Sequence, residues 1–152
     1  MHSDVCDMHS TPTRGGKKYF VTFIDDFSKY CHIYLHSKDE VLDKFKIFKT
    51  EVENQSNGKI KRLRSDRGGE YHFSEYCENV GIIHEKSAPY TPQQNGVAKI
   101  KNRTLTKMIN VMLSYSNLSF GFWGEALLTG CHIHNRIPLN GRNVTPYELW
   151  TN

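Results

Sequence analysis

The sequence contains no CxxC pair, no long apolar run and no charge excess of one sign large enough to define a function. Its four cysteines, Cys6, Cys31, Cys77 and Cys131, are far apart, which favours reduced thiols over a disulfide framework or a zinc site. No apolar run approaches the roughly 18 residues of a membrane span, and the N-terminus lacks the apolar centre of a signal peptide. We therefore expect an intracellular protein with no membrane partner.

The composition is that of a globular protein with a mild basic excess. The 152 residues carry a formal net charge of +4, and 38% are hydrophobic and 24% charged. This balance permits a nucleic-acid partner but does not require one. Because no repeat or low-complexity linker divides the chain, we expect one domain spanning residues 1–152.

The apolar pattern predicts consecutive strands in the first part of the chain and strands that alternate with helices in the rest. Strands are expected at 19–25, 30–36, 59–65 and 82–84, and helices at 39–52, 73–80, 95–113 and 120–135, with a last helical turn that Thr145 caps. Residues 2–7 are too few to assign and fit the end of a strand that carries Asp4 outward. The order predicts a mixed α/β sheet with helices on its faces.

One stretch, 64–103, places a carboxylate, a loop and a basic helix in succession. Asp66 follows a short strand and precedes two glycines, and a Pro- and Gln-rich segment then leads into the predicted helix. Lys99, Arg103 and Lys107 recur in that helix at four-residue steps. A carboxylate at a strand end beside a basic helix suggests a metal-assisted site that acts on a phosphate backbone.

Several longer stretches carry a family resemblance. They read HSDVC, YFVTFIDDFS, SKDEVLDKFKIFKTEVENQ, KIKRLRSDRGGEY, PYTPQQNGVAKIKNRTL and FWGEAL. Together they resemble the integrase core of Copia-type LTR retrotransposons over nearly the whole chain. The resemblance implies a ribonuclease-H-like fold, with a mixed five-stranded sheet flanked by helices. It also implies a DDE site that binds two Mg²⁺ or Mn²⁺ ions and transfers DNA 3′ ends into target DNA, in the nucleus.

Only two of the three acids of the family's DDE site have a matching acid in this chain. Asp4 matches the first acid and Asp66 the second, so these two are the candidate catalytic residues and metal ligands. The third acid, a Glu after GVA in the family, is Lys99 here. An ammonium group repels a divalent cation and cannot ligate it as a carboxylate does. We therefore expect weak or lost metal binding and a catalytically inactive domain.

Other departures from the family pattern point the same way. Arg67 stands where the family usually has Asn, Asp7-Met8 replaces Gly-Pro, and Ile100 replaces Arg. The family's zinc-binding N-terminal module and C-terminal region are also expected to be missing. We interpret the chain as a degenerate fragment of an integrase.

The same resemblance suggests which residues touch DNA, because the loop and helix after the second acid lie against DNA in the family. The candidates are Gln94, Asn95, Lys99, Lys101, Arg103 and Lys107. A solvated helix face beside an ordinary loop is the alternative for them. Asp25 and Asp26 are interpreted as turn residues bound to backbone, and not as a metal pair.

Three functions remain open at this point. The favoured one is an inactive integrase-like domain that keeps DNA affinity. The others are a residually active metal-dependent polynucleotidyl transferase and a non-catalytic remnant that dimerises or binds proteins through the late helices. A steep loss of DNA binding with salt would favour the first over the last.

Overall fold

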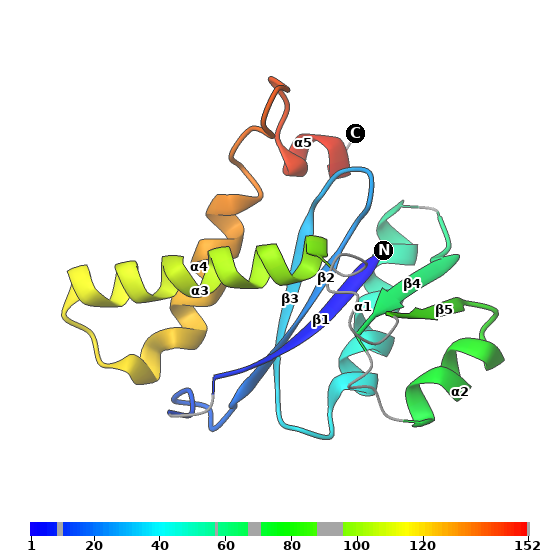
Figure 1. The fold of residues 1–152 in the computed structure, drawn as a ribbon, viewed down its shortest axis with the longest axis horizontal. Coiled ribbons are helices and arrows are strands. Elements are labelled where there is room, and N and C mark those ends of the chain that lie inside the picture. Colours follow the sequence, from blue (N-terminus) through cyan, green and yellow to red (C-terminus); the bar gives the residue numbers. More distant parts are fainter. Residues whose placement is uncertain (9–10, 57, 67–70, 88–95, 152) are drawn as a thin grey trace.

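The computed structural model shows one five-stranded mixed sheet with helices packed on both faces (Figure 1). It describes residues 1–8, 11–56, 58–66, 71–87 and 96–151. The strands are β1 (His2–Asp7), β2 (Tyr19–Ile24), β3 (Cys31–His36), β4 (Arg62–Ser65) and β5 (Ile83–Lys86), in the sheet order β3-β2-β1-β4-β5. β2 pairs antiparallel with both β1 and β3, whereas β4 pairs parallel with β1 and β5. The sheet expected from the sequence is thus confirmed.

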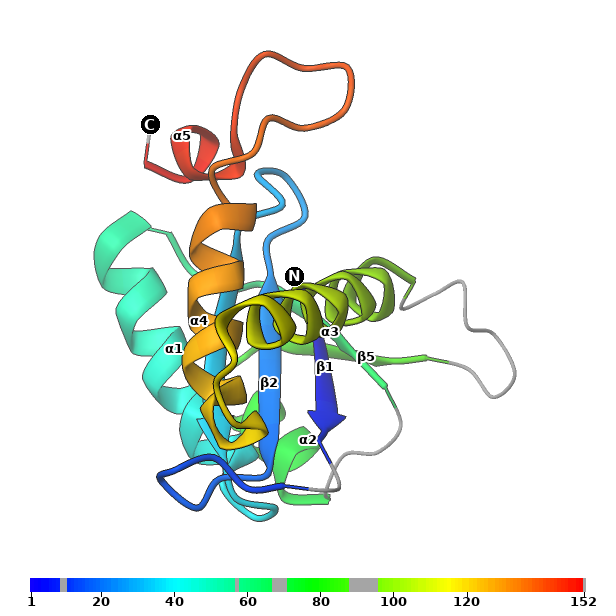
Figure 2. The same ribbon diagram turned by 90° about the vertical axis from the view of Figure 1, so that its left-hand side faces the viewer.

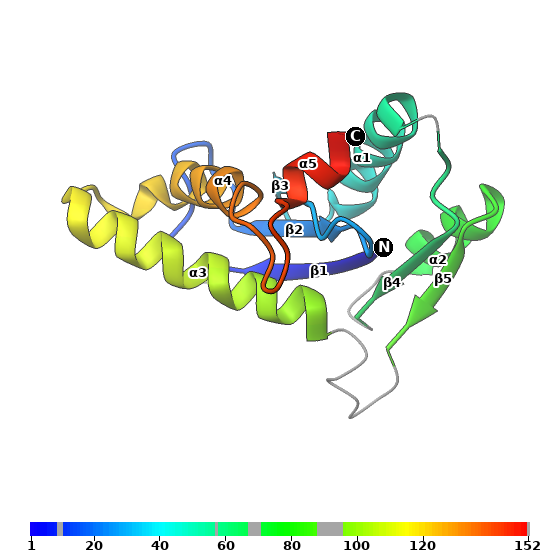
Figure 3. The same ribbon diagram turned by 90° about the horizontal axis from the view of Figure 1, so that it is seen from above.

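Two pairs of helices cover the two faces of this sheet. They are α1 (Val41–Ser56) and α2 (Tyr71–Asn79) on one face, and α3 (Gly96–Ser116) and α4 (Trp123–His134) on the other. Figure 3, seen from above, shows α3 running along β1. A short helix, α5 (Pro146–Thr151), lies near the β2–β3 connection, as Figure 2 shows from the side. Among the helices of the described residues, none is both long and apolar enough to cross a bilayer.

The alternation of side chains along β2 explains how the two helical layers are held. Phe20 and Ile24 point to α3 and α4, whereas Val21 and Phe23 point to α1 and α2. Phe23 stacks on Phe48 of α1 with the ring centroids 4.3 Å apart. A fully buried side chain of this size contributes about 1.5–3 kcal/mol through removal of apolar surface from water. The central strand therefore ties both layers to one sheet.

Several element boundaries differ from those expected. Residues 2–7, which the pattern left unassigned, form β1 and pair with β2 along their whole length. The helix expected over 120–135 is a 3-10 turn, Phe120–Phe122, followed by α4. The cap of the last helix is confirmed, since the Glu148 backbone N–H donates to Thr145 Oγ1 at 3.1 Å.

Candidate functional site

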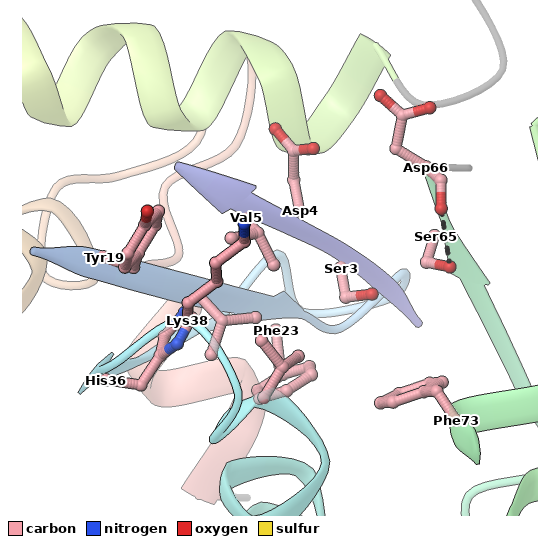
Figure 4. Close-up of a pocket in the computed structure, with 12 residues that line it drawn as sticks. Ser3, Asp4, Val5, Tyr19, Phe23, His36, Lys38, Ser65, Asp66 and Phe73 are labelled. Carbon is pink, nitrogen blue, oxygen red and sulfur yellow. Dashed lines mark hydrogen bonds between the residues drawn. The ribbon is translucent and has the colours of Figure 1, made fainter. Parts of the chain in front are cut away.

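Strand register brings Asp4 and Asp66 to the same level of the sheet. β1 and β4 are parallel, and His2 is opposite Arg64. Two residues further along each chain lie Asp4 and Asp66, on the same face as each other because side chains alternate with period two. Figure 4 shows both carboxylates directed toward the side where α3 begins. The sequence thus folds so that two carboxylates from separate elements converge.

The third group at this site is the ammonium of Lys99, in the first turns of α3. Its Nζ lies 3.0 Å from Asp66 Oδ2, and the two side chains are 44% and 45% exposed. The ion pair with Asp66, together with the more distant charge of Asp4, raises the pKa of Lys99. The site therefore holds a permanent positive charge against one of its carboxylates at any physiological pH.

Asp4 is fixed by two buried polar residues. Asn102 Nδ2 donates to Asp4 Oδ2 at 3.0 Å, and Thr22 Oγ1 donates to Asn102 Oδ1 at 3.0 Å. Burial raises the pKa of Asp4 to about 6, and the charge of Asp66 adds to this, although Lys99 and the Asn102 hydrogen bond oppose it. The carboxylate of Asp4 is therefore held in one place at a cost in hydration.

Sequence reasoning missed Asn102 and Thr22. Asn102 follows Lys99 by three residues, which places both on one helix face. This spacing was the available signal for Asn102, since the face that carries Lys99 toward the carboxylates carries Asn102 there as well. Thr22 gave no such signal, because its role depends on the register that sets it opposite Asp4.

The structure separates the candidate DNA-binding residues into two groups. Lys99, Arg103 and Lys107 are exposed on α3. Lys101, by contrast, is buried, and its Nζ lies 3.0 Å from His134 Nδ1 of α4. This position corrects the expectation for Lys101, because an ammonium buried between two helices does not reach a DNA backbone. Gln94 and Asn95 lie outside the described residues.

Beside the two carboxylates, a pocket of about 280 Å³ extends under β1 (Figure 4). Its wall is largely apolar, and its polar groups besides the two acids come from Ser3, Tyr19, His36, Lys38 and Ser65. None of these five is a carboxylate. The described residues of the pocket wall therefore supply no acidic ligand besides Asp4 and Asp66.

Among the described residues, the donor set does not fit a pair of divalent cations. Each Mg²⁺ takes oxygen ligands, usually one or two carboxylates that water and substrate phosphates complete. Within the described ranges, no three His, Cys, Asp or Glu side chains are grouped so that they would hold a metal ion. Two carboxylates converge, and an ammonium occupies the remaining side.

The interpretation of Asp25 as a turn residue agrees with the structure, since its Oδ2 accepts the Ser28 backbone N–H at 2.8 Å.

Comparison with known proteins identifies the family. The model of the integrase core domain matches residues 1–92. The Pol polyprotein of transposon TNT 1-94 from Nicotiana tabacum is 46% identical over 157 aligned residues, which include the whole of this chain. This chain belongs to the integrase core family.

Further relatives are of the same kind. Pol polyproteins of transposons RE2 and RE1 from Arabidopsis thaliana are 37% and 32% identical over 80% and 87% of the chain. The chain spans only 12%, 8% and 9% of the length of these three plant relatives. A structure of the simian T-cell lymphotropic virus intasome with a PP2A regulatory subunit superposes with a TM-score of 0.74 over 99% of this chain and 54% of that one. At 16% identity it shows that the integrase core fold is shared.

Integrase cores depend on metal in general, and in this chain Lys99 brings a cation of the protein itself to the carboxylates. The resemblance read from the sequence is confirmed, and so is the ribonuclease-H-like fold.

Proposed function

We propose that this chain is an integrase core domain that does not catalyse DNA strand transfer and that binds the DNA backbone through α3. The observation that carries this proposal is the Lys99–Asp66 ion pair, with Nζ and Oδ2 3.0 Å apart. A carboxylate must be ionised and free to ligate a metal. In this domain, a cation of the protein itself, the Lys99 ammonium, is paired with Asp66.

The magnitude of the repulsion supports loss of the metal. Unit charges 4 Å apart interact by about 4 kcal/mol at an effective dielectric near 20, so a divalent ion beside an ammonium meets about 8 kcal/mol before screening. Because Lys99 is 44% exposed, its side chain can swing away and reduce this term. It still supplies no oxygen ligand, and a site with two carboxylates and one ammonium carries only a single net negative charge.

The same arrangement allows the domain to fold without metal. Asp4 and Asp66 repel each other, and this repulsion contributes to the raised pKa of Asp4. Lys99 opposes that effect from the position of a counter-ion. We infer that the ammonium has taken over the electrostatic part of a metal's role, whereas the polarisation of a phosphate by a metal has no substitute here.

DNA binding is supported by the exposed cations of α3. Arg103 and Lys107 are exposed and follow Lys99 at four-residue steps along the helix. Four residues rise about 6 Å along a helix axis, so the three charges form a row that can contact successive phosphates of a backbone. Such contacts carry no base information, and we expect binding with little sequence preference.

The decisive experiment measures binding and nicking in the same samples. Fluorescence anisotropy of a labelled DNA duplex, from low to high salt, should show binding that weakens steeply as salt rises. Incubation of the same duplex with Mg²⁺ or Mn²⁺ should leave it uncut. Nicking that Asp66→Asn abolishes would overturn the inactive assignment and support a residual transferase.

Exposed apolar residues on the helical layer favour self-association as an additional property. Among them are Val111 and Tyr115 of α3, Leu118 just after it and Leu128 of α4, which are between 47% and 87% exposed. We propose that a second copy of the chain covers them, and sedimentation at rising concentration tests this. If the wild type forms a salt-insensitive dimer and binds no DNA, the domain is an interaction remnant.

A further inference from the structure

Two cysteines from distant parts of the chain meet in the core between the sheet and α4. Cys31 begins β3, and Cys131 lies on α4, 100 residues later. The Cys131 thiol donates to the Cys31 backbone oxygen at 3.2 Å, and the Cys31 thiol lies 3.8 Å from the His32 backbone oxygen. Both residues belong to one cluster of buried side chains. No sequence pattern predicted that these two cysteines would meet.

Polar groups surround the two thiols, although both are buried. The side-chain amide of Asn135 makes two hydrogen bonds to the Cys31 backbone. Its Oδ1 accepts the Cys31 N–H at 3.0 Å, and its Nδ2 donates to the Cys31 carbonyl oxygen at 2.9 Å. The same Nδ2 lies 3.7 Å from Cys131 Sγ. The ammonium of Lys101 acts on both sulfurs. The pair therefore sits in an electropositive, hydrogen-bonded environment and not in a purely apolar one.

This environment distinguishes Cys131 from the other three cysteines, since the neighbouring Cys131 and burial raise the pKa of Cys31. The hydrogen bond from Cys31, with help from Lys101 and Asn135, lowers the pKa of Cys131 despite its burial. Burial and the nearby carboxylates Asp4 and Asp7 raise the pKa of Cys6 to about 11, and burial with Glu78 does the same for Cys77. Thiolate character determines reactivity toward oxidants. Cys6 and Cys77 thus serve as internal controls.

We propose that Cys31 and Cys131 form a redox dithiol that a hydroperoxide converts to a disulfide between β3 and α4. This assignment is independent of the proposed function. The Cys131 thiolate attacks one oxygen of the peroxide, the O–O bond breaks, and a sulfenic acid forms on Cys131 as water or an alcohol leaves. The Cys31 sulfur then attacks the sulfenic sulfur, the S–O bond breaks, and a second molecule, water, leaves. The two thiols lose two electrons in total, and the peroxide gains them.

The disulfide would change stability in a measurable way. It encloses β4, α2 and α3, so it removes conformational freedom from most of the unfolded chain. We expect the Tm to rise by several degrees after oxidation and to return after reduction with dithiothreitol. Because Cys31 and Cys131 are only 2% and 6% exposed, a small oxidant such as hydrogen peroxide is the appropriate probe.

The experiment treats the folded protein with hydrogen peroxide and follows its intact mass and its non-reduced peptides. The expected product has lost two hydrogen atoms and contains a peptide pair linked through Cys31 and Cys131. The Cys6→Ser/Cys77→Ser variant should give the same product at the same rate. In Cys31→Ser, oxidation should stop at a sulfenic acid on Cys131 that dimedone traps, and Lys101→Met should slow oxidation of the wild-type pair roughly threefold to tenfold.

Three outcomes would overturn the proposal. One is a linkage that involves Cys6 or Cys77, and another is a protein whose mass stays unchanged at peroxide concentrations that oxidise free cysteine. The third is oxygen added to Cys131 of the wild type without linkage to Cys31. Because Cys31→Ser could fail to fold, Cys31→Ala is prepared beside it and circular dichroism verifies both variants. The wild-type product alone decides the main point.

Discussion

Lys99 and Lys101 are two residues apart on the same helix, and their surroundings are opposite. Lys99 is half exposed and lies against the Asp66 carboxylate, which raises its pKa. Lys101 is buried beside His134, Cys31 and Cys131, and burial lowers its pKa. Two residues correspond to about 200° around a helix, so one ammonium faces the carboxylates and the other faces α4.

The contrast shows that a basic helix is not a single functional surface. The exposed face of α3 brings charge to the carboxylates and to solvent, and the face toward α4 brings charge to two thiols. On the first face, the Lys99 ammonium pairs with the carboxylate of Asp66. On the second, a cation makes a buried thiol more acidic. Substitutions on the two faces test this division.

The largest effect is expected from Lys99→Glu. The substitution removes the ammonium from Asp66 and returns a third carboxylate to the site, so Mn²⁺ affinity measured by calorimetry should rise at least about tenfold. Lys99→Gln is the matched control, because it removes the charge without adding a ligand, and it should gain much less. Equal affinity in wild type and Lys99→Glu would refute the site assignment.

Lys101→Ala should cost more stability than Lys99→Ala. The buried side chain loses its packing, and His134 loses its partner, so we expect a loss of about 1–2 kcal/mol for Lys101→Ala in urea denaturation. An exposed ion pair contributes about 0–1 kcal/mol, so Lys99→Ala should change little. The reverse order would show that the two environments are not as described.

Arg103→Ala/Lys107→Ala should weaken DNA binding and lower its salt dependence. If each side chain contacts one phosphate, the slope of log K against log salt should fall by about 2. Lys101→Met, from the opposite face of the same helix, should leave that slope unchanged. The surface variant Lys59→Ala/Lys61→Ala removes two charges elsewhere, and an equal loss in it would make the effect one of net charge alone.

The smallest effect concerns Asp4→Asn and pH. The folded pKa of Asp4 is about 6, above its ordinary value of 3.8, so its ionisation destabilises the native state, and the stability it contributes below pH 4 is lost as pH rises through 6. An Asn side chain does not ionise, so it removes this destabilisation and still accepts the hydrogen bond from Asn102. The stability gained by Asp4→Asn should therefore be about 1 kcal/mol larger at pH 7.5 than at pH 5.

The pH dependence is compared between Asp4→Asn and wild type because the buried histidines change the stability of both proteins with pH, in the direction opposite to Asp4. Burial lowers the pKa of His2, His36, His84 and His134 and brings that of His32 to about 4. Their stabilising contribution is present above the ordinary value of 6.5 and is lost as pH falls. A difference between Asp4→Asn and wild type that stays constant with pH would contradict the raised pKa.

Much of the fold could be predicted from periodicity and turn residues. The β2–β3 hairpin, the amphipathic α1 and the capped α5 depend on local patterns that the sequence displays. β1 could not be assigned, because HSDVCD has little periodicity, and its pairing with both β2 and β4 comes from distant partners. The interior position of Lys101 was missed for a similar reason, since helix α4 covers that face of α3.

The site could be predicted in part. The resemblance identified Asp4, Asp66 and the exceptional Lys99, and the structure brings the three together. The Thr22–Asn102–Asp4 chain and the Cys31–Cys131 pair could not be read from the sequence, because each joins residues about 80 to 100 positions apart. Only the packing of α3 and α4 on the sheet brings them within hydrogen-bond distance.

The short contact between β1 and β4 has a mechanical consequence for the site. Their ladder consists of one register pair, His2 and Arg64, and the two acidic residues lie just beyond it on either side. The sheet thus has two parts that are joined by few hydrogen bonds, and Asp4 and Asp66 belong to different parts. The Lys99 ammonium, on the helix α3 that packs beside β1, pairs with Asp66 of the other part. This ion pair connects the two parts, so the distance between the Asp4 and Asp66 carboxylates depends on the cation that lies between them.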